Sequence, residues 1–134
     1  MTIVIVKKIS AIESDLQKAL KYSEKGDYLK AFLRNRHATH IIEKLIKHRK
    51  LGESLKDELK NIAQKLALAV QYKVEESLES AKGLEGSRKS KKLDKAWKFY
   101  DRGTRELENG RYSKAISRFI VAYRLLRTIL QHKK

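Results

Sequence analysis

The sequence contains no cysteine and no proline, and only six of its 134 residues are glycine. Without cysteine the chain has no disulfide framework and no thiolate chemistry, which favours a reducing compartment, and we expect a cytoplasmic protein. No apolar run is long enough to cross a bilayer. A chain of this length can bury one hydrophobic core without a disulfide or metal staple, so we expect a single domain spanning residues 1–134.

Acidic residues are also scarce, since 16 Asp and Glu face 32 Lys and Arg, for a net charge of +16. Residues 53–85 hold seven acidic and five basic side chains, so the rest of the chain carries a charge of +18. A charge of this size either serves solubility or matches a polyanionic partner. Nucleic acid is the most common such partner, and an anionic membrane surface is the next.

Apolar residues recur at steps of three and four, which predicts helices, and glycines mark the helix ends. The expected helices span about 10–25, 27–50, 54–82, 92–109 and 111–131. Only the β-branched run at 3–6 resembles a strand, which would cap the core or pair between chains in a homo-oligomer. We therefore expect an all-α bundle of about five helices.

Two antiparallel helical hairpins, at 10–50 and 92–132, are predicted to be joined by a connector helix at 53–83 and a mobile basic linker at 84–91. A shift of 84 positions superimposes these hairpins. Six identities carry the match, pairing Gly26, Tyr28, Lys30, Ala31, Arg34 and Ala38 with Gly110, Tyr112, Lys114, Ala115, Arg118 and Ala122. Apolar identities are common to amphipathic helices, but shared cations indicate that a surface was repeated together with a core.

The helical periodicity also predicts which side chains are buried. In the last helix the expected core stripe comprises Tyr112, Ala115, Ile116, Phe119, Ala122, Leu126, Ile129 and Leu130. In the long third helix it comprises Leu55, Leu59, Ile62, Leu66, Leu68, Ala69 and Val70.

The phrases at 26–31 and 110–115, each between two amphipathic helices, resemble the hairpin of tetratricopeptide repeats. In that family the glycine ends the first helix, the tyrosine packs over the turn and the alanine allows close approach of the helices. The resemblance covers about 35 residues per copy. It implies a protein interaction adaptor, in which the positive charge serves solubility or an acidic protein partner.

The same phrase is similar to the helical HEPN domains, and to small archaeal helical proteins of unknown function. HEPN ribonucleases carry an arginine followed four to six residues later by a histidine, a spacing that Arg34 and His40 satisfy. The resemblance implies His40 as general acid or base and Arg34 as phosphate stabiliser. In the alternative interpretation, Arg34 and Arg36 are surface cations, while His37 and His40 flank the core stripe.

Other catalytic patterns are absent from the sequence. His37 and His40 lie one helical turn apart with Glu43 nearby, which is too few ligands to predict a metal site. The sequence contains no glycine-rich phosphate loop, nucleophile elbow or converging carboxylate pair. We therefore expect no enzymatic activity, no metal and no cofactor.

The function predicted from the sequence is non-enzymatic, largely sequence-independent binding of DNA or RNA through the phosphate backbone, by an accessory subunit or an architectural or coat protein. The linker cations would form a flexible arm that follows phosphates. The adaptor is the main alternative and a HEPN-like ribonuclease the minor one. The candidate nucleic-acid contacts are Lys30, Arg34, Arg88, Lys89, Lys91, Lys92, Lys114, Arg118 and Arg124.

Overall fold

The computed structural model describes residues 3–83 and 87–131, except for the side chains of residues 87–90. It contains five α-helices and, within these residues, no strand, which confirms the predicted all-α bundle. The helices are α1 (Ile3–Glu24), α2 (Tyr28–Leu45), α3 (Glu53–Ala81), α4 (Ser87–Glu108) and α5 (Tyr112–Gln131).

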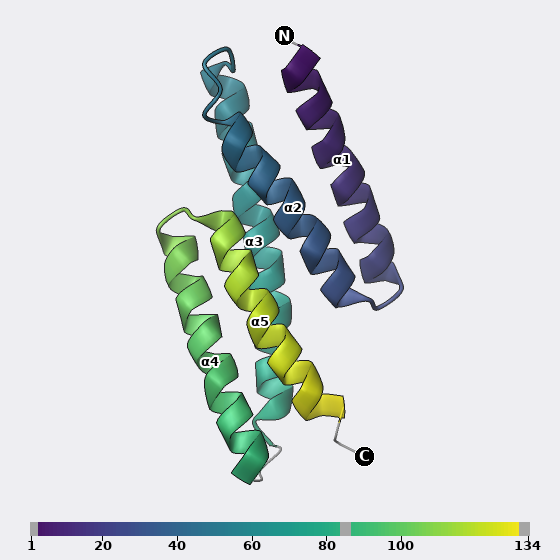
Figure 1. The fold of residues 1–134 in the computed structure, drawn as a ribbon, viewed down its shortest axis with the longest axis vertical. Coiled ribbons are helices and arrows are strands. Elements are labelled where there is room, and N and C mark those ends of the chain that lie inside the picture. The colour runs from purple at the N-terminus through teal and green to yellow at the C-terminus, as the bar shows by residue number, and fades with distance from the viewer. Residues whose placement is uncertain (1–2, 84–86, 132–134) are drawn as a thin grey trace.

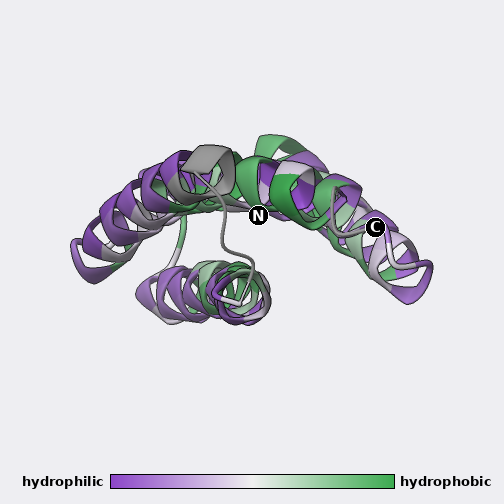
Figure 2. Ribbon diagram, turned by 90° about the horizontal axis from the view of Figure 1, so that it is seen from below, coloured by the Kyte–Doolittle hydropathy of each residue, from purple (hydrophilic) through white to green (hydrophobic). Residues whose placement is uncertain are grey.

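Four of the helices form a curved layer in the order α1, α2, α5, α4 (Figure 1). Each helix packs on its neighbour in that order, and α2 and α5 run antiparallel in the middle. The fifth helix, α3, lies on the concave side of the layer and packs on α2, α5 and α4 (Figure 2). We call α1, α2, α5 and α4 together the helical layer. The side of this layer that faces away from α3 is its convex face.

The two hairpin turns have the same backbone geometry at the 84-residue offset. Gly26 and Gly110 both adopt positive φ angles, of 78° and 74°, a region where a side chain would be strained. In each turn the residue after the glycine donates its N–H to the carbonyl five residues back, at 2.8 Å and 2.9 Å. This is the pattern of a Schellman motif, which ends a helix by satisfying its last carbonyls.

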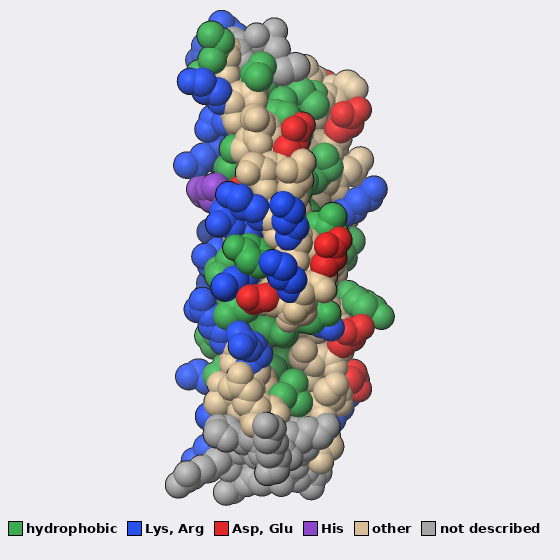
Figure 3. Space-filling view, turned by 90° about the vertical axis from the view of Figure 1, so that its right-hand side faces the viewer, with side chains coloured by type: hydrophobic (Ala, Val, Ile, Leu, Met, Phe, Trp, Pro, Cys, Tyr) green, Lys and Arg blue, Asp and Glu red, His purple; other side chains and the backbone are tan. Residues whose placement is uncertain are grey.

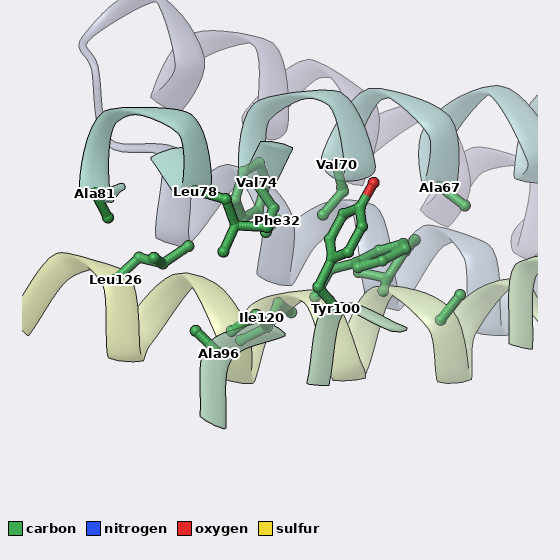
Figure 4. Packing of buried hydrophobic residues seen from close by; sticks show 14 of the residues in the cluster. Phe32, Ala67, Val70, Val74, Leu78, Ala81, Ala96, Tyr100, Ile120 and Leu126 are labelled. Carbon is green, nitrogen blue, oxygen red and sulfur yellow. The ribbon is translucent and has the colours of Figure 1, made fainter. Parts of the chain in front are cut away.

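Small residues let α3 approach the layer closely. Ala67, Ala81 and Val70 of α3 are fully buried and face Ala96 of α4 and Leu126 of α5 across the core (Figure 4). A second cluster of buried residues joins α1, α2 and the first half of α3. The core therefore runs the length of α3, although α1 contacts only α2 among the helices of the layer.

The predicted core of α5 is largely right, but that of α3 is partly wrong. In α5, Ala115, Ile116, Phe119, Ala122, Leu126 and Ile129 are buried, with Tyr112 and Leu130 partly so. In α3, Leu59 and Val70 are buried and Leu55 and Leu66 partly buried, whereas Ile62, Leu68 and Ala69 are exposed. The buried stripe of α3 is Leu59, Ala63, Ala67, Val70, Val74, Leu78 and Ala81. The prediction favoured large apolar residues, whereas close helix packing selected the stripe containing alanines.

Three helix boundaries also differ from the prediction. Residues 3–6 belong to α1, because Ile5 continues the buried seven-residue spacing of Ile12 and Ala19 and this helical context overrides β-branched propensity. The second helix ends at Leu45 instead of residue 50. Because α4 begins at Ser87, the prediction of a mobile linker is wrong for residues 87–91, while residues 84–86 lie outside the described part.

Tyr100 of α4 joins α3 to α4 through its hydroxyl, which donates a hydrogen bond to the Glu75 carboxylate. Burial of the phenol, assisted by Glu75, raises the pKa of Tyr100 above its ordinary value of about 10. Folding therefore favours the neutral phenol. This contribution to stability is complete below about pH 10 and is lost as the pH rises through the folded-state pKa.

We expect Tyr100→Phe to lower the free energy of unfolding by about 1 kcal/mol at pH 7, because Glu75 loses its donor. The variant should also lose less stability than the wild type between pH 9 and 11. Urea unfolding followed by circular dichroism measures both effects, with the exposed Tyr72→Phe as control. Equal alkaline sensitivity of Tyr100→Phe and wild type would contradict the role of this phenol.

Candidate functional site

Charge is segregated between the two sides of the molecule. In a side view, Lys and Arg gather along the edge formed by the convex face, and Asp and Glu gather along the opposite edge (Figure 3). Three carboxylates on the α3 side, Glu53, Glu76 and Glu79, pair with lysines three residues away on the same stretch of chain. The acidic side chains of α3 are thus partly neutralised locally and do not offset the cations of the convex face.

Three adjoining hollows lie on the convex face along α2, and we call them together the seam groove. Their volumes are about 460, 370 and 480 Å³, and each shares lining residues with the next. The first lies between α1 and α2 and is lined by Tyr22, Lys30, Leu33, Arg34, Arg36 and His37. The second lies between α2 and α5 and is lined by Leu33, Arg36, His37, His40, Ser113, Lys114 and Ser117. The third lies at the start of α5 and is lined by His40, Glu43, Lys44, Ile46, Lys47, Gly110, Arg111, Ser113 and Lys114.

The groove forms because α2 presents residues at steps of three and four to the convex face. Its opposite face, through Phe32, Thr39 and Ile42, is buried against the rest of the core. The row therefore follows the axis of α2 from Lys30 to Lys44, a rise of about 21 Å at the helical repeat, and Lys47 lies in the turn after the helix. Most of the cations along it extend into solvent.

The groove cations differ in whether a carboxylate neutralises them. Lys30 Nζ lies 3.6 Å from Asp27, and Arg111 lies 3.6 Å from Glu106. Within the described part of the chain, the other three lysines of the groove and Arg36 have no carboxylate within ion-pair distance. These unpaired groove cations are Arg36, Lys44, Lys47 and Lys114.

Asp15 of α1 holds two groove residues in place. Its side chain is only 5% exposed, and it accepts a hydrogen bond from Arg34 Nη1 at 3.3 Å and contacts His37 Nδ1 at 2.5 Å. The sequence analysis missed this carboxylate, because only the packing of α1 on α2 brings it to Arg34. At the 84-residue offset Asp15 corresponds to Phe99, so Arg118 has no equivalent partner. The two arginines that match in sequence therefore have different surroundings.

Glu43 of α2 caps the N-terminus of α5 from the neighbouring helix. Its Oε2 accepts backbone N–H groups from Tyr112 at 3.1 Å and Ser113 at 3.5 Å. A helix N-terminus carries unsatisfied N–H groups and a partial positive charge, so a carboxylate there is stabilising. Since the residue before α5 is Arg111, which cannot act as an acceptor cap, the Glu43 carboxylate takes that role.

We expect Glu43→Gln to lower the free energy of unfolding by about 1 kcal/mol, because the negative charge at the helix terminus is lost. Glu58→Gln, on the exposed side of α3, provides the matched control and should change stability by less than about 0.5 kcal/mol. Chemical denaturation at pH 7 measures both. Equal stabilities of the two variants would show that the cap contributes nothing.

The nine candidate contacts predicted from the sequence do not form one site. Lys30, Arg34 and Lys114 line the seam groove. Lys91 lines a separate hollow of about 500 Å³ on α4, together with Lys95, Lys98 and Arg102. Lys92, Arg118 and Arg124 line neither hollow, and the side chains of Arg88 and Lys89 lie outside the described part.

Six Lys, Arg and His residues of the groove were absent from the predicted set, namely Arg36, His37, His40, Lys44, Lys47 and Arg111. Most of them share the i, i+3, i+4 spacing on α2, a signal available in the sequence. The spacing alone places these residues on one face of α2. It does not predict a groove, because the opposite wall comes from α5.

Arg34 and His40, the pair suggested by the HEPN resemblance, line different hollows. Arg34 lines the first hollow, and His40 lines the second and third. Across the residues described, no three His, Asp or Glu side chains form a group able to hold a metal ion.

Comparisons with protein-family models, with curated proteins and with solved structures found no match to this chain. None of the described helices combines the length and apolarity needed to cross a bilayer.

Proposed function

We propose that this protein binds nucleic acid through the phosphate backbone, with the seam groove as the main contact surface. The observation that carries this proposal is the row of unpaired cations, Arg36, Lys44, Lys47 and Lys114, in one continuous groove. Phosphates release condensed counterions when lysine and arginine neutralise them, which makes such a surface attractive to any nucleic acid. No side chain of the groove needs to read a base for this binding, so it is largely independent of sequence.

The separation of charge supports a nucleic acid over a membrane or a simple role in solubility. Charges that serve only solubility gain nothing from lying in one row, since like charges side by side repel one another. Among the described residues that line the seam groove, none is a large exposed apolar side chain of the kind that enters lipid. The large exposed apolar side chains of the described residues lie on α1 and α3, and are Ile3, Val4, Val6, Leu20, Ile62, Leu68 and Tyr72.

The positions of the exposed apolar side chains weaken the alternative of a protein interaction adaptor. An adaptor that binds a partner helix needs a contiguous apolar groove. The exposed apolar side chains fall into two sets, one on α1 and one on α3, and these two helices make no close backbone contact. The seam groove has apolar residues on its floor, but cations line its rims, which favours a polyanion over the apolar face of a helix.

The test is a fluorescence-anisotropy titration of labelled random-sequence oligonucleotides from 50 to 300 mM salt. Neutralisation of several phosphates predicts a linear fall of log affinity against log salt, with a slope of about −0.7 to −0.9 per phosphate contacted. Affinity should vary little between sequences of equal length and strand form. Weak binding with no salt dependence would overturn the proposed function.

A further inference from the structure

Building on the proposed nucleic-acid binding, we propose that the seam groove takes a single strand and not a duplex. The strand would follow α2 from Lys30, and then the turn after this helix to Lys47, with its phosphates on the cationic rims and its bases over the floors of the hollows. Three features of the described structure support this choice: the curvature of the layer, the width of the groove and the composition of its floor.

The curvature of the layer has the wrong sign for enclosing a duplex. The groove cations lie on the convex face, whereas α3, which carries acidic residues, lies on the concave side, as the curved layer in Figure 2 shows for the helices. Duplex DNA has a persistence length of about 150 bp, so it stays straight over the length of this molecule. Because the layer curves across its helices (Figure 2), a straight duplex laid along α2 would touch only the crest of the layer, and the surface would fall away from it on both sides.

The groove is also narrow. Its second hollow lies between α2 and α5, two packed helices whose axes in such contacts are about 8–10 Å apart. A duplex cannot enter a depression between adjacent helices, because even its major groove is about 12 Å wide. A single strand has no such restriction, since its backbone bends at each nucleotide.

The floor of the groove suits unpaired bases. Leu33 is shared by the first two hollows, Ile46 lies in the third, and the small Ser113 and Ser117 leave the second open. The rings of Tyr22 and His40 and the guanidinium plane of Arg36 supply flat surfaces of the kind on which bases stack. In a duplex the bases are already stacked on each other, so these surfaces would have no ligand.

The experiment compares a labelled single strand with a duplex of the same length and sequence, at equal salt, using the full chain. We expect the single strand to bind at least about tenfold more tightly, with affinity levelling off beyond on the order of four to eight nucleotides. Equal or tighter binding of the duplex would overturn the single-strand inference and leave the proposed function standing. If neither form binds, the proposed function itself fails.

A second measurement tests the contact between floor and bases. The double variant Leu33→Ser and His40→Ala removes floor groups without removing a lysine or arginine, and is assayed at pH 8, where histidine side chains ordinarily carry no charge. We expect its affinity for the single strand to fall by about tenfold at unchanged salt slope, because bases and not phosphates lose contacts. Its control is Leu20→Ser with His48→Ala, outside the groove, which should bind as the wild type does. Unchanged affinity of the groove variant, with folding verified by circular dichroism, would contradict base contacts.

Discussion

Phe119→Ala is expected to lower the free energy of unfolding by about 3–5 kcal/mol, the largest effect of any single substitution considered for this chain. The side chain of Phe119 projects from α5 and is fully buried. Its ring packs on α4, with its centroid 5.6 Å from that of Tyr100. Truncation removes the apolar contacts and leaves a cavity that rigid helices cannot close. Tyr72→Ala removes an aromatic ring that is 66% exposed and should cost less than about 0.5 kcal/mol.

The other side of this contact provides a second test. Gly103 of α4 lies directly under the Phe119 ring, and a Cβ built on it would lie 2.5 Å from Cε1. Gly103→Ala should therefore destabilise by about 1–3 kcal/mol, although alanine in a helix is ordinarily favoured over glycine by about 1 kcal/mol. Combining it with Phe119→Leu should recover part of the loss. A stabilised Gly103→Ala variant would mean that α4 packs less closely than the structure indicates.

Reversing two groove charges is expected to have the largest effect on binding. Lys44 and Lys114 line the same hollow and have no carboxylate partner among the described residues, so Lys44→Glu with Lys114→Glu places two anions where phosphates would bind. Affinity for nucleic acid should fall on the order of 100-fold, and the salt slope should decrease by about 1.4–1.8 units.

The matched control changes the net charge by the same amount on the other side of the molecule. Lys60 and Lys65 are exposed on α3, and their joint replacement by glutamate should lower affinity by only about threefold, through the long-range field. Anisotropy titrations at three salt concentrations compare the two double variants. Equal losses in both would show that overall charge, and not the groove, attracts the ligand.

The two hairpins related by the 84-residue offset share their turn geometry and buried positions but differ in the polar groups around their matching arginines. The turns at Gly26 and Gly110 share their hydrogen bonding, and the apolar positions after them are buried in both hairpins. The polar surroundings are not shared, because Asp15 neutralises Arg34 whereas the residue that corresponds to Asp15 at the 84-residue offset is Phe99. A matching residue in two helices thus predicts its backbone geometry better than its electrostatic environment, which depends on the neighbouring helix.

Several features were determined by the sequence itself. The helical class, the glycine turns and the buried face of α5 follow from local periodicity and from the conformational freedom of glycine, which act over a few residues. The excess of positive charge outside α3 is likewise a property of the sequence alone. These features require no knowledge of which helices are neighbours.

Only the tertiary structure decided where those charges lie and what surrounds them. The order α1, α2, α5, α4 places Lys114 beside His40 and Glu43 against the start of α5, although about 70 residues separate Glu43 from its hydrogen-bond partners. The alanine-containing stripe of α3 was likewise selected by close packing against the layer, which then left its acidic residues on the concave side. The first hollow lies between consecutive helices, but the walls of the second and third come from α2 and α5, so these two hollows depend on helix packing that no local pattern encodes.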